Sequence, residues 1–330
     1  MTAAEKHPTR TALIAGFAAI YLIWGSTYLG IRIAVETMPP FLMAGVRFLV
    51  AGAIVAAFIA LTRGFRATRK QWRDNAITGG FLCLGGNGLV SWSEQKIPSG
   101  IATLIISAGP VFIVLMDWAV HAWFKDGKRG TKPAAATFVG LAIGIVGLAI
   151  LVGPDVMATG VGSLDPWSVL GLLAATLLWG VGMLYMRYAS EPAEPFTASG
   201  IQMICGSGWL LLTAVLTGEL AHFDPAVITS RSVLAWSYLV VFGSLIGFST
   251  FTWLMKHSTP ARVSTYAYVN PVVAVFLGWF VLHEPVSPRI FVAAGVIIAG
   301  VAIITVTKNR KSPAAPVTVV VAAEPARKSA

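Results

Sequence analysis

The sequence predicts an all-α polytopic membrane protein whose ten transmembrane helices form two five-helix repeats of inverted topology. Three observations lead to this fold class. Hydrophobic residues make up 56% of the 330-residue chain and charged residues only 12%, about half of the charged share of a soluble domain. Apolar runs long enough to cross a bilayer recur along the whole chain. The two halves of the chain also share an internal repeat.

Each apolar run of spanning length predicts one helix. The first run follows a short N-terminal segment, 1–11. It is too long for a signal-peptide core and ends in no small-residue cleavage site, so we expect it to be retained. The Pro- and Ala-rich residues 308–330 are predicted to form a disordered tail. The predicted spans are 12–35, 41–62, 75–94, 98–123, 133–152, 166–189, 196–217, 232–256, 260–282 and 288–307.

Positive residues gather in alternate loops of the predicted topology. The loop between the fifth and sixth spans carries Asp155 and Asp165 and no Lys or Arg, whereas the loop between the second and third spans carries Arg63, Arg66, Arg69, Lys70 and Arg73. The positive-inside rule therefore predicts a multi-pass protein of the cell inner membrane with both termini in the cytoplasm. Most of the positive residues behind the net charge of +10 lie in loops and tails, so we expect a lipid bilayer and no nucleic acid as partner.

The internal repeat indicates how the spans are organised. Residues 24–49 align without gaps to residues 179–204 with nine of 26 positions identical, where composition alone would give roughly two. Farther along, Gly86, Trp92 and Pro110 match Gly247, Trp253 and Pro271. We place the two repeats at 12–152 and 166–307. Because five is odd, the second repeat enters the membrane from the opposite side, which is typical of secondary transporters that bind substrate near the midplane.

Several stretches resemble a known family. They are "WGSTYLGIR" at 24–32, "QKIPSGIATLIISAGPVF" at 95–112 and "STPARVSTYAYVNPVVAVFLGWFVLHEPVS" at 258–287. Together they resemble the ten-helix EamA branch of the drug/metabolite transporter superfamily, and within it the YddG-type exporters of aromatic and other amino acids. The resemblance implies a central cavity lined by spans one to four and six to nine. It also implies export of amino acids or related metabolites by alternating access.

Polar and aromatic residues inside the spans are the candidate substrate contacts. Aromatic anchoring at the lipid headgroups and hydrogen bonding between helices are the alternative roles for these side chains. As substrate-binding residues we predict Trp24, Tyr28, Asn87, Ser91, Ser107, Trp179, Gln202, Trp253, Tyr266, Tyr268 and Asn270.

Charged residues inside the spans are few. Arg32 lies within reach of the interface, where we expect it to be anchored, while Arg47 is deeper and is a candidate to attract a carboxylate. Asp117 is the only acidic residue well inside a predicted span, and it lies toward the cytoplasmic end. We therefore expect transport to be facilitative or weakly coupled to ions.

Two prolines interrupt the fourth and ninth spans at matching positions of the two repeats. A proline has no amide hydrogen, so the carbonyl four residues earlier lacks its helical donor. The carbonyl concerned is that of Ile106 for Pro110 and that of Ala267 for Pro271. In a membrane such a carbonyl requires a cavity, water or a neighbouring side chain. We predict that these two helices are alternating gates; a static kink that helps packing is the alternative.

Other functional classes fit less well. The sequence contains no HExxH metal motif and no intramembrane partner for Asp117, so an enzyme is a remote alternative and no cofactor or metal is expected. No filter-like motif indicates a channel. A multidrug or other metabolite exporter remains the main alternative. The glycine-rich run 140–147 predicts a packing face against the tenth span or against a second protomer, so both a monomer and a homodimer remain open.

Overall fold

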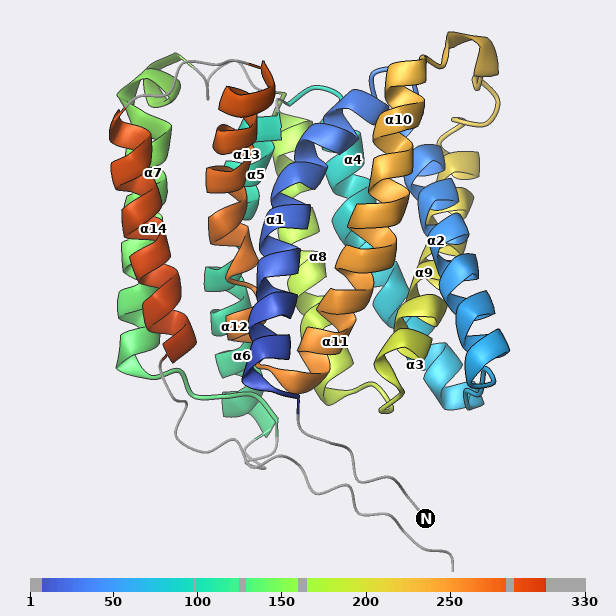
Figure 1. Cartoon of the computed structure of the whole chain (residues 1–330), viewed down its shortest axis with the longest axis horizontal. Coiled ribbons are helices and arrows are strands. Elements are labelled where there is room, and N and C mark those ends of the chain that lie inside the picture. Colours follow the sequence, from blue (N-terminus) through green and yellow to red (C-terminus); the bar gives the residue numbers. More distant parts are fainter. Residues whose placement is uncertain (1–7, 98, 125–128, 160–164, 283–287, 307–330) are drawn as a thin grey trace, which may run out of the picture.

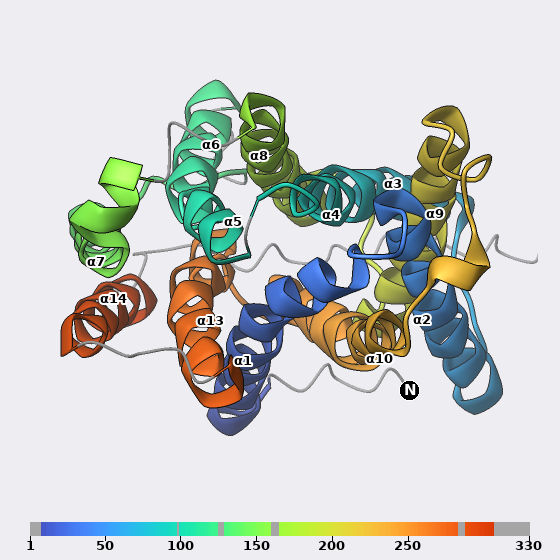
Figure 2. The same ribbon diagram turned by 90° about the horizontal axis from the view of Figure 1, so that it is seen from above.

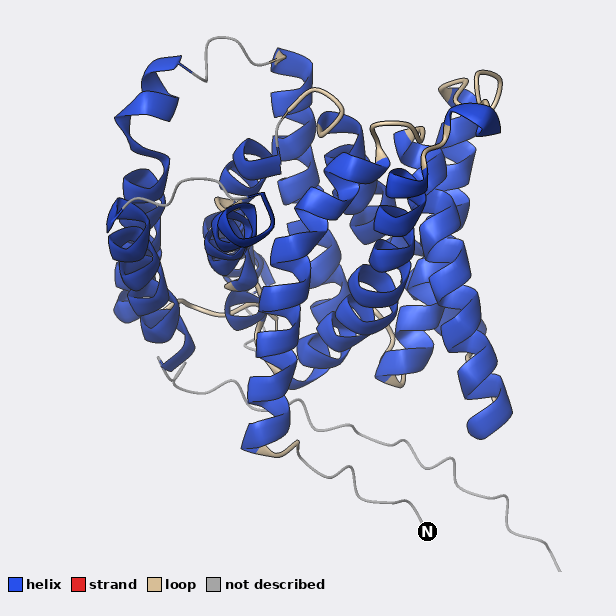
Figure 3. Cartoon of the chain, turned by 45° about the horizontal axis from the view of Figure 1, so that its top comes forward, coloured by secondary structure: helices blue, strands red, loops and turns tan. Residues whose placement is uncertain are grey.

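A computed structural model describes residues 8–97, 99–124, 129–159, 165–282 and 288–306. The predicted tail and residues 1–7 of the predicted N-terminal segment lie outside the described residues. Within these ranges Figure 3 shows helices and loops without a strand. The all-α prediction is therefore confirmed.

The described helices form ten segments that run between two faces of the bundle (Figure 1). We call the end where the first helix begins the N-terminal face and the other end the opposite face. Five segments are continuous stretches long and apolar enough to cross a bilayer by themselves. In order, the helices are α1 (Arg10–Ala34), α2 (Pro40–Thr62), α3 (Arg69–Gly79), η1 (Gly80–Gly88), α4 (Leu89–Ser93), α5 (Ser99–Ile106), α6 (Gly109–Phe124), α7 (Ala135–Thr159), α8 (Pro166–Tyr188), α9 (Pro195–Leu216), η2 (Pro225–Val227), α10 (Ser230–Tyr238), η3 (Leu239–Phe248), α11 (Ser249–His257), α12 (Pro260–Val263), α13 (Tyr266–Leu282) and α14 (Pro288–Val306).

Short polar side chains determine where several helices begin. The Thr9 hydroxyl accepts a hydrogen bond from the Ala12 amide at the start of α1, and Thr68 forms a capping box with Gln71 at the start of α3. The Asp165 carboxylate accepts from the Ser168 amide at the start of α8. Such caps satisfy backbone donors that the first helical turn leaves free.

Seen from above, the bundle consists of two facing rows of helices (Figure 2). One row contains α7, α6 with α5, α8, and α4 with α3; the other contains α14, α13, α1 and α10. The helix pair α7 and α14 closes one end of the rows, and α2 packs on α9 at the other end. Each row therefore combines helices from both halves of the chain.

Inter-helix packing follows the sequence repeat. Helices α7 and α14, the fifth and tenth segments, approach so closely that a Cβ at Gly300 would lie 2.8 Å from the Gly140 carbonyl oxygen. The glycine-rich run of the fifth segment therefore faces the tenth. Equivalent helix pairs also recur. Helix α1, the first segment, packs on α13 of the ninth segment, and α8, the sixth segment, packs on α6 of the fourth.

Two arginines show the inverted symmetry at atomic detail. Near the opposite face, Arg32 Nη1 donates to the carbonyls of Glu94 and Gln95. Near the N-terminal face, its repeat mate Arg187 donates to those of Met255 and Lys256. The same bond pattern at opposite ends of the bundle is what an inverted repeat requires.

Candidate functional site

A cavity with about 730 Å³ of empty space lies between the two rows of helices. Its walls come from both repeats, as expected for a binding site on the pseudo-twofold axis. It is lined by Trp24, Thr27, Tyr28, Ile31, Arg47, Gly86, Asn87, Val90, Ile106, Gly109, Pro110, Ile113, Ala175, Thr176, Trp179, Gly243, Phe248, Ser264, Tyr266 and Ala267.

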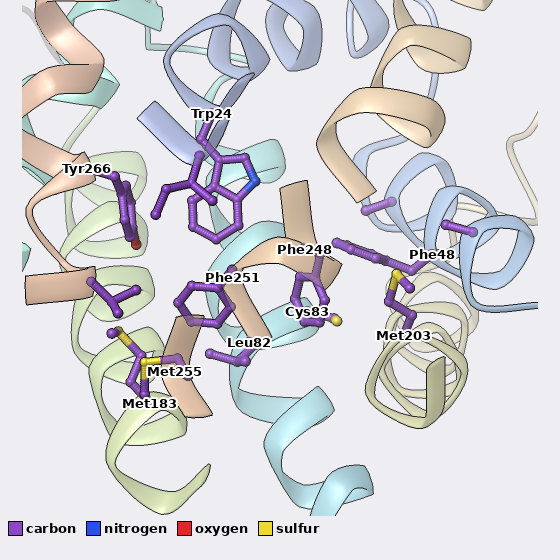
Figure 4. Close-up of a cluster of buried hydrophobic side chains, with 14 of the residues drawn as sticks. Trp24, Phe48, Leu82, Cys83, Met183, Met203, Phe248, Phe251, Met255 and Tyr266 are labelled. Atoms are coloured by element: carbon purple, nitrogen blue, oxygen red, sulfur yellow. The ribbon is translucent and has the colours of Figure 1, made fainter. Parts of the chain in front are cut away.

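Aromatic side chains from four segments meet at the cavity's N-terminal end. The Trp24 ring lies edge-on to Trp179 with centroids 5.5 Å apart, and edge-on to Tyr266 at 4.7 Å. Phe251 packs against both tryptophans, at 5.1 Å from Trp24 and 5.2 Å from Trp179. Figure 4 shows Trp24, Tyr266 and Phe251 converging above the buried side chain of Met183. These rings offer flat apolar faces to a ligand and separate the cavity from the N-terminal face.

Each cavity tryptophan packs on a glycine of the other repeat. A side chain at Gly86, in η1, would overlap the Trp179 ring, and one at Gly247, in η3, would overlap the Trp24 ring. Both glycines lie in π-helical stretches, which frequently mark functional sites. The Trp24 indole donates to the Gly243 carbonyl at 3.3 Å, whereas the Trp179 Nε1 lies beside the Tyr266 side chain without a well-formed hydrogen bond.

Arg47 brings a positive charge to the cavity wall. Its side chain is only 2% exposed. Its Nε donates to the Ser244 hydroxyl at 2.8 Å, while its Nη1 is buried without a hydrogen-bond partner. No carboxylate lies within salt-bridge distance of Arg47 among the described side chains. The guanidinium also lies over the Phe48 ring at 4.8 Å. Because a buried guanidinium is costly without an acceptor, the unpartnered Nη1 can bind an anionic group.

The carbonyl left without a donor by Pro271 is satisfied by the fourth segment. The buried Ser107 hydroxyl lies 2.8 Å from the Ala267 carbonyl oxygen and 2.7 Å from the Thr103 carbonyl oxygen of its own helix, so its one hydrogen is shared between two acceptors. A neighbouring side chain therefore supplies the donor that the sequence required. The breaks of the two helices differ: the fourth segment is interrupted at 107–108, next to Pro110, whereas the ninth is interrupted at 264–265 and Pro271 lies inside α13.

A second pocket, with about 660 Å³ of empty space, lies at the N-terminal face. We call it the N-terminal vestibule; among the residues lining it are Asn75, Met186, Arg187, Gln202, Thr252, Met255 and Lys256. Gln202 donates to the Asn75 carboxamide at 2.7 Å. The vestibule residue Met186 is half-buried, whereas its repeat mate Ile31 is buried near the opposite face; Ala198 and Met255 are buried, as are their mates Met43 and Glu94. The two ends of the molecule therefore differ at the position of Met186 and Ile31.

Comparison with known proteins places this architecture in a family. The EamA-like transporter family matches residues 11–153 and again residues 166–306. The chain belongs to this family. An uncharacterized inner membrane transporter of Escherichia coli, YedA, is 35% identical over 300 residues, covering 90% of this chain and 91% of its own. This EamA-like protein is accordingly a multi-pass inner-membrane transporter.

More distant relatives support the same fold. The uncharacterized transporter YoaV of Bacillus subtilis is 22% identical and covers 90% of this EamA-like chain and 97% of its own. A protein of known crystal structure superposes with a TM-score of 0.69 at 23% identity, over 90% of this chain and 97% of that one. This likeness concerns the fold alone.

The predicted site residues of this EamA-like protein fall into separate places. Five of the predicted contacts line the cavity together with Pro110, namely Trp24, Tyr28, Asn87, Trp179 and Tyr266. Gln202 lines the N-terminal vestibule instead. Ser91 is buried and bonds to the carbonyl of Asn87, and Ser107 bonds to Ala267. Asn270 is buried beside the Tyr28 hydroxyl without a well-formed hydrogen bond.

Two of the predicted contacts point away from the cavity. Tyr268 is fully buried in a cluster with Leu141 and Ile297, where its ring covers Gly144 of α7. Trp253 packs against His257 and covers Gly16 of α1. Tyr268 and Trp253 were predicted to bind substrate because they are aromatic residues within a span. The structure places them on helix faces that pack against other helices.

Other residues of the site were not predicted. Thr27 and Thr176 line the cavity one turn from Trp24 and Trp179, so helical periodicity could have found them. Phe248 is one apolar residue among many, and no sequence signal distinguished it. Glu94 was placed at the end of a span, yet the structure buries it completely.

Proposed function

We propose that this transporter exports aromatic and other apolar amino acids from the cytoplasm by alternating access. The observation that carries the proposal is the buried Arg47 guanidinium with an unpartnered Nη1 in an aromatic cavity. A guanidinium binds a carboxylate through charge-assisted hydrogen bonds, and aromatic walls favour an apolar or aromatic side chain.

Alternating access is supported by the difference between the two ends. The N-terminal vestibule and its buried counterpart at the opposite face are related by the inverted repeat, so exchanging the conformations of the two repeats would close one end and open the other. Pro110 and Pro271 would act as hinges of the fourth and ninth segments, which the Ser107–Ala267 bond joins.

The N-terminal face would lie in the cytoplasm. Exposed positive residues gather there, among them Arg63, Arg66, Arg69 and Lys70. The positive-inside rule favours that orientation. A periplasm-only reporter fused after Lys311 should be inactive; an active reporter would contradict the orientation.

A drug or neutral metabolite is the second candidate substrate, because most of the other described lining residues are apolar. Counterflow in proteoliposomes separates the two, with phenylalanine, its decarboxylated amine phenethylamine and a neutral lipophilic drug as probes. A charge-assisted bond contributes about 1.5–3 kcal/mol, so Arg47→Gln should reduce phenylalanine counterflow by roughly 10- to 150-fold. Arg63→Gln, in an exposed loop, is the control.

The aromatic wall is tested separately. Trp24→Leu should reduce phenylalanine counterflow, while Trp253→Leu, the repeat-conserved tryptophan outside the cavity, should leave it near the wild-type rate. If phenethylamine or the drug exchanges while phenylalanine does not, the amino-acid assignment is wrong.

A further inference from the structure

Glu94 is a buried carboxyl group for which the proposed mechanism so far has no use. Its side chain has an exposed fraction of 0% and neither carboxyl oxygen has a hydrogen-bond partner. Nor does Glu94 take part in a salt bridge among the described residues. An ionised carboxylate is strongly disfavoured in such surroundings, whereas the protonated form is tolerated.

The charged and titratable groups around Glu94 do not compensate a negative charge. Arg32 of α1 approaches it but donates to the backbone carbonyls of Glu94 and Gln95 instead of the carboxylate. Tyr28 of α1 is the other titratable group within electrostatic range. Nearby, Lys96 pairs with Asp165 at the surface. The helices packed on α4 are α8, η1 and α2; their charged residues are Arg187, near the N-terminal face, and Arg47, at the cavity wall, and neither pairs with Glu94.

Glu94 is connected to the substrate cavity by helix geometry. It follows Val90, a cavity residue, by four positions, so the two lie one turn apart on the same face of α4. Tyr28 also lines the cavity. It interacts electrostatically with Glu94 and lies beside Asn270 of the proline-containing α13. Water that fills the cavity would therefore come within one helical turn of this carboxyl group.

The inverted repeat indicates what happens to Glu94 when the transporter changes state. Its mate, Met255, lines the N-terminal vestibule, and the mate of Arg32, Arg187, lines it too. Exchanging the conformations of the repeats would thus form a vestibule at the opposite face with Glu94 in its wall. Because Met255 is itself only 2% exposed, the Glu94 carboxyl group would border the water of that vestibule rather than project into it.

We propose that Glu94 is a proton-binding site through which this carrier exchanges one proton for each exported substrate molecule. In the state open to the opposite face, the carboxylate takes a proton from water there. Closure of that end buries the neutral carboxyl group, as in this structure. Release of the proton to water in the cavity, when the N-terminal face is open, requires the carboxyl group to move out of the buried position that it has in this structure; only O–H bonds form and break. The identity of the exchanged substrate rests on the proposed function, whereas the proton site at Glu94 does not.

Proteoliposomes with a pH gradient of one unit test the coupling, with the membrane voltage held at zero by potassium and valinomycin. One-for-one exchange should concentrate phenylalanine up to about tenfold on the acidic side, because one pH unit corresponds to 1.36 kcal/mol. Glu94→Gln should keep phenylalanine counterflow while accumulation falls to about one. Glu94→Asp should retain part of the accumulation, and Asp117→Asn, which alters an acid outside the cavity, should retain all of it.

Several outcomes would overturn the proposal. One is counterflow without accumulation by the wild-type protein, and another is accumulation of phenylalanine by Glu94→Gln equal to that of the wild type. Loss of phenylalanine counterflow with retention of its deaminated analogue would make Glu94 an ammonium ligand instead. If no amino acid is exchanged, the proposed function fails, and infrared spectroscopy still tests the site. The wild type should show the C=O stretch of a protonated carboxyl group at neutral pH, which Glu94→Gln removes; its absence refutes the proton site.

Discussion

The hydrogen bond between Ser107 and the Ala267 carbonyl supports a quantitative prediction. Pro271 has no amide hydrogen, so the Ala267 carbonyl lacks its helical donor. The Ser107 hydroxyl lies 2.8 Å from that carbonyl oxygen and shares its hydrogen with the Thr103 carbonyl at 2.7 Å. Ser107→Ala would leave this buried acceptor unpaired, which costs about 1–3 kcal/mol in proteins and about 0.6–2 kcal/mol for hydrogen bonds between membrane helices. We expect a loss of about 1–2 kcal/mol in the free energy of unfolding.

The same substitution should cost much less when Pro271 is replaced. In Pro271→Ala, the new amide can donate to the Ala267 carbonyl, so the hydroxyl is no longer its sole donor. A double-mutant cycle of Ser107→Ala and Pro271→Ala should therefore give a coupling free energy of about 1 kcal/mol or more. Reversible unfolding in mixed micelles measures the four stabilities, and Ser107→Thr, which keeps the hydroxyl, is the conservative control.

The transport side of the same cycle tests the gating proposal. Pro271→Ala should fold and yet slow counterflow and bias the accessibility of cysteine probes toward one face. Equal costs of Ser107→Ala in both backgrounds would refute the hydrogen-bond reasoning. Wild-type exchange with unchanged two-sided accessibility in Pro271→Ala would show that the proline only helps packing.

Three further predictions follow from other parts of the structure. Single cysteines at Trp24, Asn87 and Trp179 should react with membrane-impermeant thiol reagents and be protected by substrate, whereas one at Tyr268, turned toward α7 and α14, should stay inert. Gly86→Ala and Gly247→Ala, which overlap the cavity tryptophans, should lower the melting temperature and the counterflow rate, with Gly208→Ala, where no atom lies within 4 Å, as the neutral control. Hydrogen bonds from the Ser168 hydroxyl and amide lower the pKa of Asp165 below its ordinary value. The carboxylate therefore stabilises the start of α8 fully when the pH is above the ordinary pKa of an aspartate. This stabilisation is lost as the pH falls through the lowered pKa. The difference in melting temperature between Asp165→Ala and the wild type should accordingly disappear in acid.

The number and order of the helices were determined by the sequence. Long apolar runs can satisfy their backbone in a bilayer only as helices, and the matched Trp24 and Trp179, Arg32 and Arg187, and Pro110 and Pro271 showed that the chain contains two copies of one unit. Because each copy has an odd number of spans, inversion followed from counting. The need for a donor to the Ala267 carbonyl was likewise predictable, since it depends only on the chemistry of proline.

The tertiary structure decided which helix faces meet. Tyr268 and Tyr266 are two residues apart, yet one packs against α7 and the other lines the cavity, because positions two apart on a helix point in different directions. Hydropathy could not separate them, since every face of a buried membrane helix is apolar. The burial of Glu94 and the unpartnered Nη1 of Arg47 also depend on neighbours distant in sequence. Local pattern therefore specified the helices, while the packing between the two repeats created the site.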